Sequence, residues 1–134
     1  MKILIDTQIF LWIFLYPSRI SPDVESLLKN PSNDIFLSAA SVWEIAIKYA
    51  SGKLQLPAAP EIFVPDRVKR SNFKRLEINY EHALAVTNLP QIHKDPFDRL
   101  LIAQANVENL TLLSADKIFA RYIVKFIDSE TFKI

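Results

Sequence analysis

Four of the fifteen acidic residues stand where carboxylates could do chemistry. Most of the others lie beside lysines or arginines, in segments typical of a solvated surface. These four instead follow short apolar runs or lie within apolar helical patterns: Asp6, Glu44, Asp98 and Asp116. If they share one crevice, their charges repel unless they are protonated or neutralised by a cation. Because Mg²⁺ and Mn²⁺ prefer oxygen ligands, the four residues predict a site for one of these ions.

The segments around the four acids indicate how they could be brought together. Short apolar runs alternate with longer helical patterns, which favours an α/β domain with a mainly parallel sheet of four or five strands and helices on both faces. With 134 residues, half of them hydrophobic, we expect a single domain over residues 1–134. In such sheets the active crevice lies beyond the carboxyl ends of the strands. Asp6 and Asp116 are both expected at such strand ends.

The expected elements follow from hydrophobic periodicity and from helix start and stop signals. Ser21 and Pro22 are typical of an N-cap and a first helical position, and Gly52 is typical of a helix end. We expect strands at 2–6, 34–38, 73–78, 111–115 and 123–128, and helices at 7–16, 21–30, 39–52, 60–72, 81–89 and 96–109, with a helical turn at 116–122. Pro65 is expected to disturb the helix that contains it.

The stretch "HKDPFDRLLIAQA" (93–105) holds two aspartates three residues apart. Asp95 before Pro96 is a standard helix start, with the aspartate as N-cap. Asp98 then falls at the third helical position, where the helix dipole also favours a negative charge. It lies one turn before Leu101 and so begins the apolar, inward-facing stripe, which is more than a cap requires. We therefore expect Asp95 to start the helix and Asp98 to serve the site.

The other three acids also have structural interpretations that the sequence leaves open. Asp6 could cap the helix that follows it, and Asp116 could be an ordinary turn or N-cap residue. Glu44 could complete a capping box with Ser41, because the two have the S-x-x-E spacing. Against that, Glu44 is flanked by apolar residues within a mostly apolar helix, which is a costly place for a carboxylate without a partner.

Composition excludes several kinds of site. The chain has no cysteine and only two histidines, His82 and His93, so thiol chemistry is excluded and a zinc site of the usual Cys/His kind nearly so. We expect both histidines to be surface or core residues. With Gly52 as the single glycine, neither a P-loop nor a GxGxxG dinucleotide motif can be written. The net charge of +1 is too balanced to indicate a nucleic-acid partner by itself.

The apolar amino-terminal segment is too short to be a membrane span. The uninterrupted run from Ile9 to Tyr16 falls well below the roughly 20 residues that cross a bilayer, and Asp6 precedes it. No small-residue cleavage site follows a basic region. We expect a buried strand and a buried helix here, in a cytoplasmic protein without membrane contact. The helix at 7–16 is apolar nearly all round, and its excess apolar surface could contribute to an interface.

The segment "RVKRSNFKR" (67–75) concentrates five basic residues in nine positions. A solvated helix face is one interpretation of this segment. The other is a patch that follows the phosphates of a nucleic acid, with Phe73 available for stacking.

Four stretches together resemble the PIN domain: "ILIDT", "SAASVWEIAIK", "LPQIHKDPFDRLLIAQA" and "LLSAD". They occur in the order of that family over nearly the whole chain, and the "DPFDRLLIAQA" stretch is the most specific of them. The nearest likeness is to the VapC-type toxins of bacterial type II toxin–antitoxin pairs. The resemblance implies a doubly wound α/β fold and an endoribonuclease that depends on Mg²⁺, with Mn²⁺ as an alternative.

The resemblance also implies site residues. Asp6, Glu44 and Asp98 match the first three acids of the family, and Asp116 matches its less constant fourth acid. Thr7 matches the small hydroxyl residue after the first acid, and Ser114 matches a polar position two residues before the last. Gln8 stands where similar toxins often carry histidine or another polar residue, so the family pattern assigns no single residue type to this position. No role is therefore carried over to position 8.

The resemblance further implies partners. These are an RNA substrate, a second copy of the chain in a dimer, and a cognate antitoxin whose carboxyl-terminal segment blocks the groove of the toxin. The expected chemistry is hydrolysis of RNA phosphodiester bonds by water activated at a divalent cation. A PIN-like fold without catalysis, kept only to bind a partner, is the alternative.

Two other enzyme and signalling classes fit less well. A phosphotransfer enzyme of the haloacid dehalogenase type needs an acid at position 8, where Gln8 stands. A phospho-receiver module needs adjacent acids and a late lysine in a pattern that is absent here.

Overall fold

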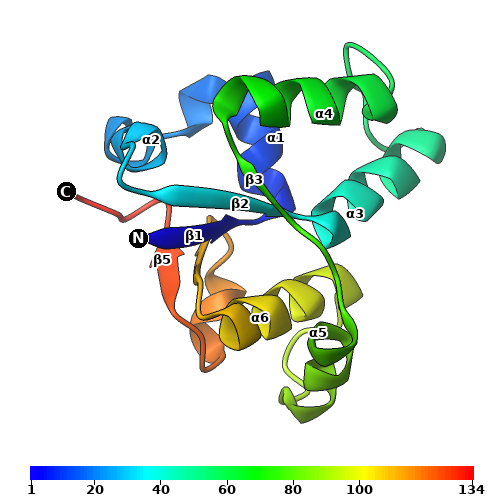
Figure 1. Cartoon of the computed structure of the whole chain (residues 1–134), viewed down its shortest axis with the longest axis vertical. Helices are drawn as coiled ribbons and strands as arrows, with labels where there is room; N and C mark the ends of the chain where they lie inside the picture. The colour runs from blue at the N-terminus through cyan, green and yellow to red at the C-terminus, as the bar shows by residue number, and fades with distance from the viewer.

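A computed structural model describes all residues from Met1 to Ile134. Its centre is a five-stranded sheet in which every pair of neighbouring strands is parallel, as predicted (Figure 1). The strand order is β3-β2-β1-β4-β5. The strands are β1 (Lys2–Ile5), β2 (Asp34–Ser38), β3 (Lys74–Leu76), β4 (Thr111–Ser114) and β5 (Phe126–Asp128).

Helices connect the strands, so that each parallel neighbour is reached by a crossover. The helices are α1 (Thr7–Leu15), α2 (Pro22–Lys29), α3 (Ala39–Ala50), α4 (Pro60–Ser71), α5 (Tyr80–Ala85) and α6 (Pro96–Glu108). Short 3₁₀ turns occupy Pro17–Arg19, Val86–Asn88 and Lys117–Arg121. None of these helices has the length and apolar character needed to cross a membrane.

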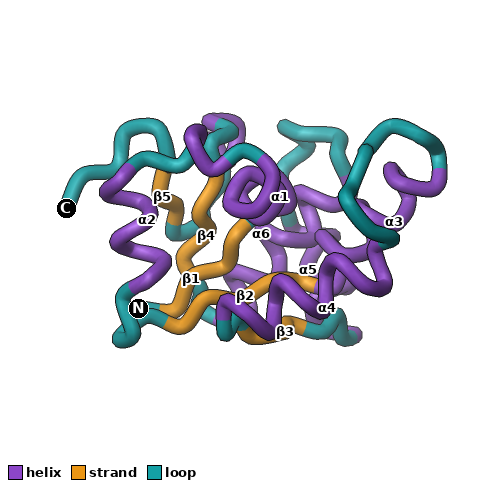
Figure 2. The backbone as a smooth tube through the Cα atoms, turned by 90° about the horizontal axis from the view of Figure 1, so that it is seen from above, coloured by secondary structure: helices purple, strands orange, loops and turns teal.

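The sheet separates two apolar layers, which confirms the prediction of helices on both faces. Along β1, Ile3 and Ile5 pack into the cluster formed with α1, α2 and α4, whereas Leu4 points to the opposite cluster, formed with α6. This alternation is the two-residue period of a strand that is buried on both faces. The two layers flank the sheet in Figure 1, and Figure 2 looks down on it from the side of α1, α2 and α4.

The order of the strands creates a switch point beside β1. The chain runs outward from β1 to β2 and β3, then returns to place β4 and β5 on the other side of β1. Ligand sites of open α/β sheets lie beyond the carboxyl ends of the strands at such a switch. Helix α3 lies at this end of the sheet, where it contacts α1 and α4 of one layer and α6 of the other.

Helix ends are set by the local signals that the sequence predicted. The Ser21 hydroxyl accepts a hydrogen bond from the backbone N–H of Val24, with Pro22 at the first helical position of α2. Pro65 does not break α4, contrary to the expected disturbance. The carbonyl that its missing N–H would have bonded belongs to Glu61, which is exposed and can bond to water instead.

Three predicted elements are shorter than expected. The last strand starts at Phe126 and not at position 123, where Ile123 is 97% exposed. The helix predicted at 81–89 divides into α5 and the 3₁₀ turn Val86–Asn88. The strand predicted at 73–78 is reduced to β3, which pairs only with β2 at the edge of the sheet. An edge strand with one partner has fewer ladder hydrogen bonds to extend it.

Candidate functional site

Asp6 lies where β1 ends and α1 begins, and it is 5% exposed. One carboxylate oxygen accepts a hydrogen bond from the backbone N–H of Ile9 at 2.8 Å, and the other accepts one from the hydroxyl of Ser114. Burial raises the pKa of Asp6 to about 7; these two hydrogen bonds oppose the shift, and the charges of Asp98 and Glu44 add to it. The capping interpretation is therefore correct, but the cap leaves one oxygen directed toward the end of β4.

Asp98 occupies the first turn of α6, and its side chain is 19% exposed. Its Oδ2 lies 2.9 Å from Nε2 of His93. Burial raises the pKa of Asp98 to about 6, opposed by the hydrogen bond to His93 and supported by the charges of Asp95 and Glu44. Asp95 is the N-cap, as predicted, because its carboxylate accepts from the backbone N–H groups of Phe97 and Asp98 at 2.8 and 3.1 Å.

Glu44 lies on α3, the helix that spans the two layers, and it is 6% exposed. Its carboxylate pairs with the ammonium group of Lys48 one turn later, at 2.7 Å. The hydrogen bond to Glu44 raises the pKa of Lys48, and the charges of Glu44, Asp95 and Asp98 add to the shift. The capping-box interpretation of Glu44 is wrong, because the N-cap of α3 is Ser38.

Ser41, the other half of that supposed capping box, accepts a hydrogen bond from the hydroxyl of Thr7 at 2.8 Å. Both residues are buried, so the contact ties the first turn of α3 to the start of α1. Thr7 therefore fixes the position of the helix that carries Glu44, relative to the helix that Asp6 caps.

Asp116 follows β4 and is exposed. Its carboxylate caps the 3₁₀ turn by accepting from the backbone N–H of Ile118 at 3.0 Å. Its own backbone N–H donates to the Ser114 hydroxyl at 2.9 Å, and that hydroxyl donates to Asp6. Ser114 thus links the first and last of the predicted acids.

The structure brings the four predicted acids to one end of the sheet. Asp98 and Glu44 each act on the pKa of Asp6, and ligand atoms of Asp98 and Asp116 lie within 4.8 Å of each other. The charge of Lys48 acts on this group of acids, but its ammonium pairs directly with Glu44. Burial is the main cause of the raised pKa values of Asp6 and Asp98, and the charges of the neighbouring acids add to both shifts. A divalent ion with oxygen ligands fits this donor set. The role of the four acids as ligands stays a prediction.

His93 belongs to the site, although the sequence predicted only a surface or core residue. Its ring faces Asp98 and is 27% exposed. The signal available in the sequence was its place five residues before Asp98 in the same motif, but a loop of that length does not define where a side chain points. His82 is a core residue, as predicted: it is 1% exposed, lies 2.7 Å from a carboxylate oxygen of Glu108, and completes a capping box with Asn79.

Arg99 holds the loop that carries His93. Its guanidinium is nearly buried and donates to the backbone carbonyls of Pro90 at 2.8 Å and His93 at 3.4 Å. Two further carbonyls, of Val86 and Leu89, lie within 3.5 Å. The hydroxyl of Tyr122 accepts from the backbone N–H of His93 at 2.8 Å. This single cation therefore orders the segment between the 3₁₀ turn Val86–Asn88 and α6.

We expect Arg99→Leu to lower the free energy of unfolding by about 2–4 kcal/mol, because several partly buried backbone carbonyls lose a charged donor. Urea denaturation monitored by circular dichroism measures this change. The matched control is Arg121→Leu, an exposed arginine on the 3₁₀ turn Lys117–Arg121, which should change the stability by less than about 0.5 kcal/mol. Equal effects of the two substitutions would contradict the role given to Arg99.

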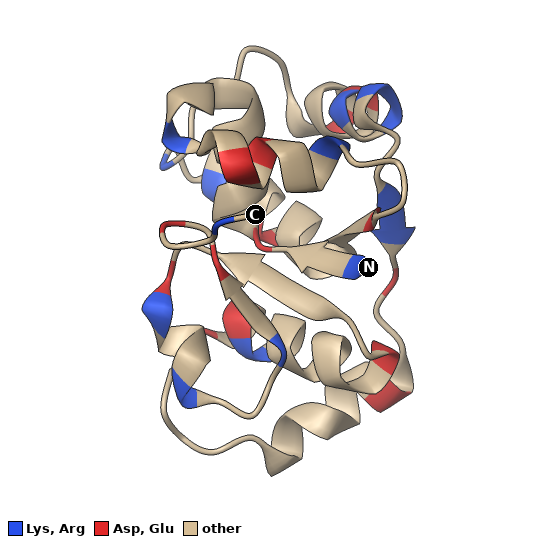
Figure 3. Ribbon diagram, turned by 90° about the vertical axis from the view of Figure 1, so that its left-hand side faces the viewer, with Lys and Arg blue, Asp and Glu red and all other residues tan.

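The basic segment 67–75 is largely paired with acids. Arg67 and Arg70 both contact Asp66, Lys74 lies 3.2 Å from Asp34, and the Arg75 guanidinium lies 3.4 Å from Glu77. Asp34 begins β2, so Lys74 is at the end of the sheet opposite to the acids. Figure 3 shows acidic and basic residues interspersed over the helices in that view. These contacts favour a solvated surface over a phosphate-binding patch.

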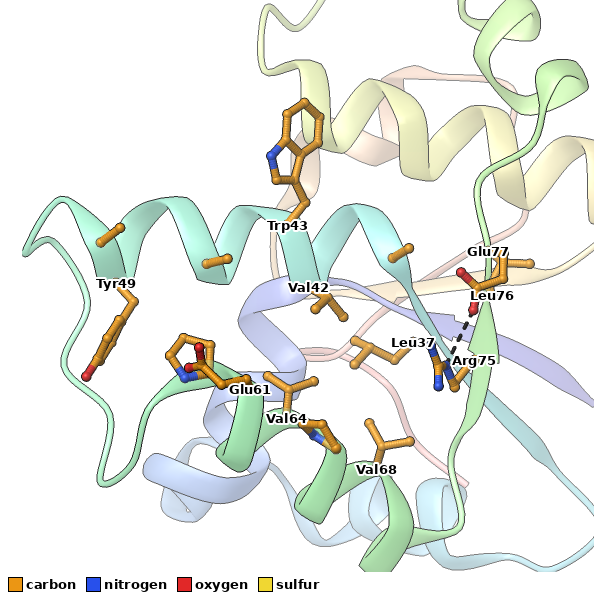
Figure 4. A pocket seen from close by; sticks show the side chains of 15 residues that line it. Leu37, Val42, Trp43, Tyr49, Glu61, Val64, Val68, Arg75, Leu76 and Glu77 are labelled. Carbon is orange, nitrogen blue, oxygen red and sulfur yellow. Dashed lines mark ion pairs between the residues drawn. The ribbon is translucent and has the colours of Figure 1, made fainter.

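An apolar cavity of about 670 Å³ lies between α3 and α4 (Figure 4). Val42 on α3 faces Val64 and Val68 on α4 across it, whereas Trp43 points away from α4. Trp43 is 57% exposed, and its ring packs edge-on against Phe97, with the ring centres 5.2 Å apart. Because Glu44 follows Trp43 and Asp98 follows Phe97, this aromatic pair borders the acidic site.

Comparisons with known proteins agree with this fold. The model of the PIN domain family matches residues 3–125. Over 60 residues the chain is 40% identical to Ribonuclease VapC16 of Mycobacterium tuberculosis, a match that covers 45% of this chain and 43% of that protein's length.

Solved structures share the fold over nearly the whole chain. VapBC2 from Rickettsia felis, bound to a promoter DNA fragment, has a chain with a TM-score of 0.69 at 18% identity, covering 95% of this chain and 98% of that one. A toxin–antitoxin complex from Klebsiella pneumoniae has a chain with a TM-score of 0.61 at 20% identity, covering 98% of both chains. At these identities the likeness establishes the fold alone.

Proposed function

The chain belongs to the PIN domain family, and from that premise we propose that it is a metal-dependent endoribonuclease and the toxin of a VapC-type toxin–antitoxin pair. The observation that carries the proposal is the group of carboxylates at the end of β1, among which Asp6 and Asp98 have raised pKa values. The likeness of this chain to Ribonuclease VapC16, which covers less than half of either protein, supports the same activity.

The proposed ligands of Mg²⁺ or Mn²⁺ are Asp6, Glu44, Asp98 and Asp116. Hydrolysis of a phosphodiester needs an activated water and relief of the charge that develops on the phosphate, and a bound divalent cation supplies both. Carboxylates are suited to holding such ions, and burial at Asp6 and Asp98 makes their charge costly until a cation arrives. Binding a cation lowers the free-energy cost of these buried charges, and this favours its binding.

The remaining side chains of the site position these carboxylates. Ser114 and the backbone N–H of Ile9 hold the two oxygens of Asp6 in fixed directions. Lys48 directs the carboxylate of Glu44 and partly neutralises it. The contact between Thr7 and Ser41 keeps α3 against α1. Because these partners are already in place, the carboxylates need little reorganisation to bind an ion.

RNA is the proposed substrate, and the exposed ring of Trp43 is a candidate surface for stacking a base beside the acids. The lysines and arginines of segment 67–75 form ion pairs with acidic residues, so they supply little free positive charge for binding RNA. The proposed partners are a second copy of the chain and an antitoxin segment. The apolar cavity between α3 and α4 supports the latter, because it offers an apolar segment of a partner an uncovered place to bind.

The experiment that tests the function uses total cellular RNA, the purified chain and mapping of new 5′ ends. We expect new 5′ ends with the wild type and Mg²⁺, and none with EDTA or with Asp6→Asn. A neutral asparagine side chain at this position keeps the helix cap but lacks the charge that would hold a cation. Asp23→Asn on α2, far from the site in sequence and fold, should cleave like the wild type. Absence of cleavage with Mg²⁺ and with Mn²⁺ would favour the non-catalytic, partner-binding alternative.

A further inference from the structure

Three side chains from separate segments converge beside the acidic site. Ligand atoms of His93, Asp98 and Asp116 all lie within 4.8 Å of one another. They come from the loop before α6, the first turn of α6, and the turn after β4. We propose that His93 is a direct nitrogen ligand, together with Asp98 and Asp116, for a divalent transition-metal ion such as Mn²⁺ or Zn²⁺. The inference rests on the metal site of the proposed function, and it adds a ligand and an ion class to it.

The spacing of the donor atoms suits a shared ion. Nε2 of His93 and Oδ2 of Asp98 are 2.9 Å apart. Two adjacent ligands at 2.0–2.2 Å from one metal ion are separated by about 3 Å in six-coordinate geometry. Two ligand atoms on opposite sides of the ion would be about 4 Å apart. The ligand atoms of the three residues, which all lie within 4.8 Å of one another, can therefore also take such positions. The side chains need no large movement to share an ion.

The donor types select the class of ion. Carboxylate oxygens alone suit Mg²⁺, which holds its water tightly and takes few protein ligands. An imidazole nitrogen adds more affinity for transition-metal ions, and Zn²⁺ binds more tightly than Mn²⁺ to sites with nitrogen and oxygen donors. A site of one nitrogen and two carboxylates is therefore expected to discriminate against Mg²⁺.

The histidine is placed by the fold and not by its contact with Asp98 alone. Tyr122 and Arg99, both nearly buried, bond the backbone N–H and carbonyl of His93. The ring is partly exposed, and its second nitrogen has no partner within the protein, so this nitrogen can donate its hydrogen to water while Nε2 binds a metal. A ligand that is held from its backbone in this way loses little freedom on binding.

A simpler interpretation is a hydrogen bond between His93 and Asp98 that takes no part in metal binding. In that case the hydrogen on Nε2 stays in place when an ion binds elsewhere in the site. The two interpretations differ at one atom, so a measurement on that nitrogen separates them.

The chain suits nitrogen NMR of histidine side chains, because it contains only two of them. Protein labelled with ¹⁵N-histidine is titrated with Zn²⁺, a diamagnetic ion, and separately with Mg²⁺, without RNA. We expect Zn²⁺ to shift the Nε2 signal of His93 and to fix the hydrogen on Nδ1, and Mg²⁺ to do neither. His82 is the internal reference, because it is buried and bonded to Glu108. An unchanged Nε2 signal at saturating Zn²⁺ would overturn the proposal.

Calorimetric titration gives a second readout. We expect His93→Gln to weaken Mn²⁺ binding at least about tenfold and Mg²⁺ binding less than about twofold. Glutamine can still bond to Asp98 but offers no imidazole nitrogen. In the double variant Asp98→Asn with Asp116→Asn, we expect Zn²⁺ to cause no shift of the His93 Nε2 signal. A shift that persists in this variant would show that the histidine binds zinc without the two carboxylates, against the proposal.

Both measurements are made without RNA, so they are independent of cleavage. A His93 shift in a chain that cleaves no RNA would refute the ribonuclease and leave the metal ligand standing. Cleavage that needs Asp6 but comes with no shift at His93 would leave the ribonuclease standing and refute the ligand.

Discussion

Asp98→Asn is expected to reduce the rate of RNA cleavage by at least about a hundredfold and to leave the fold intact. The substitution removes one negative charge from the centre of the acidic group, where it lies close to His93, Asp116 and Glu44. Asparagine keeps the shape of the side chain and is tolerated in the first turn of a helix. The rate is measured from cleavage of a fluorescent oligoribonucleotide in samples quenched at successive times. Circular dichroism shows whether the fold is retained.

The matched control is Asp95→Asn, the same substitution three residues earlier. Asparagine is as good an N-cap as aspartate, so the hydrogen bonds to the backbone of Phe97 and Asp98 can persist. We expect the control to retain cleavage to within about tenfold, since the substitution removes only the effect of the Asp95 charge on the pKa of Asp98. If Asp98→Asn cleaves RNA at the wild-type rate at any Mg²⁺ concentration, the assignment of Asp98 is wrong.

The second large effect concerns stability against pH in the absence of divalent ions. The pKa of Asp6 is raised from 3.8 to about 7 in the folded protein. Between these values the folded state holds a proton that the unfolded state has released. The free energy of unfolding therefore falls as the pH rises from about 4 to about 7, by a total on the order of 4 kcal/mol. The raised pKa of Asp98 lowers the free energy of unfolding further as the pH rises from about 4 to about 6.

Asp6→Asn should remove the Asp6 part of this dependence and should be more stable than the wild type at pH 8. Asparagine keeps the helix cap and carries no charge to bury. Urea denaturation in EDTA from pH 4.5 to 8.5 measures both curves, and their difference isolates Asp6 from all other titrating groups. A difference that stays constant across this range would contradict the raised pKa.

The same reasoning predicts the direction of the metal effect. A divalent ion bound to Asp6 and Asp98 stabilises their charged forms and so offsets the cost of burying them. The wild-type curve should therefore flatten when the ion is added. Functional sites often contain arrangements that lower the stability of the fold, because ligand binding requires them.

The sequence alone predicted the architecture because its signals are local and repeated. Alternating apolar runs and helical patterns identified all five strands and the six α-helices, with errors at ends such as 123–125. Parallel strands have their carboxyl ends at one edge, so the positions of Asp6 and Asp116 after their strands sufficed to place them there. In the doubled aspartate of "HKDPFDR", helix geometry separated the cap Asp95, which the structure confirms, from Asp98, whose part in the site stays a prediction.

Only the tertiary structure decided which neighbours serve these acids. The contacts of Asp6 with Ser114, and of Thr7 with Ser41, join residues 108 and 34 positions apart. His93 and Arg99 lie in or bind a loop, where no periodicity tells which way a side chain points. The pKa values of Asp6 and Asp98 depend on burial, which arises only when both layers close over the sheet. Local pattern thus determined the fold and the acids, whereas long-range packing determined how the acids are held and charged.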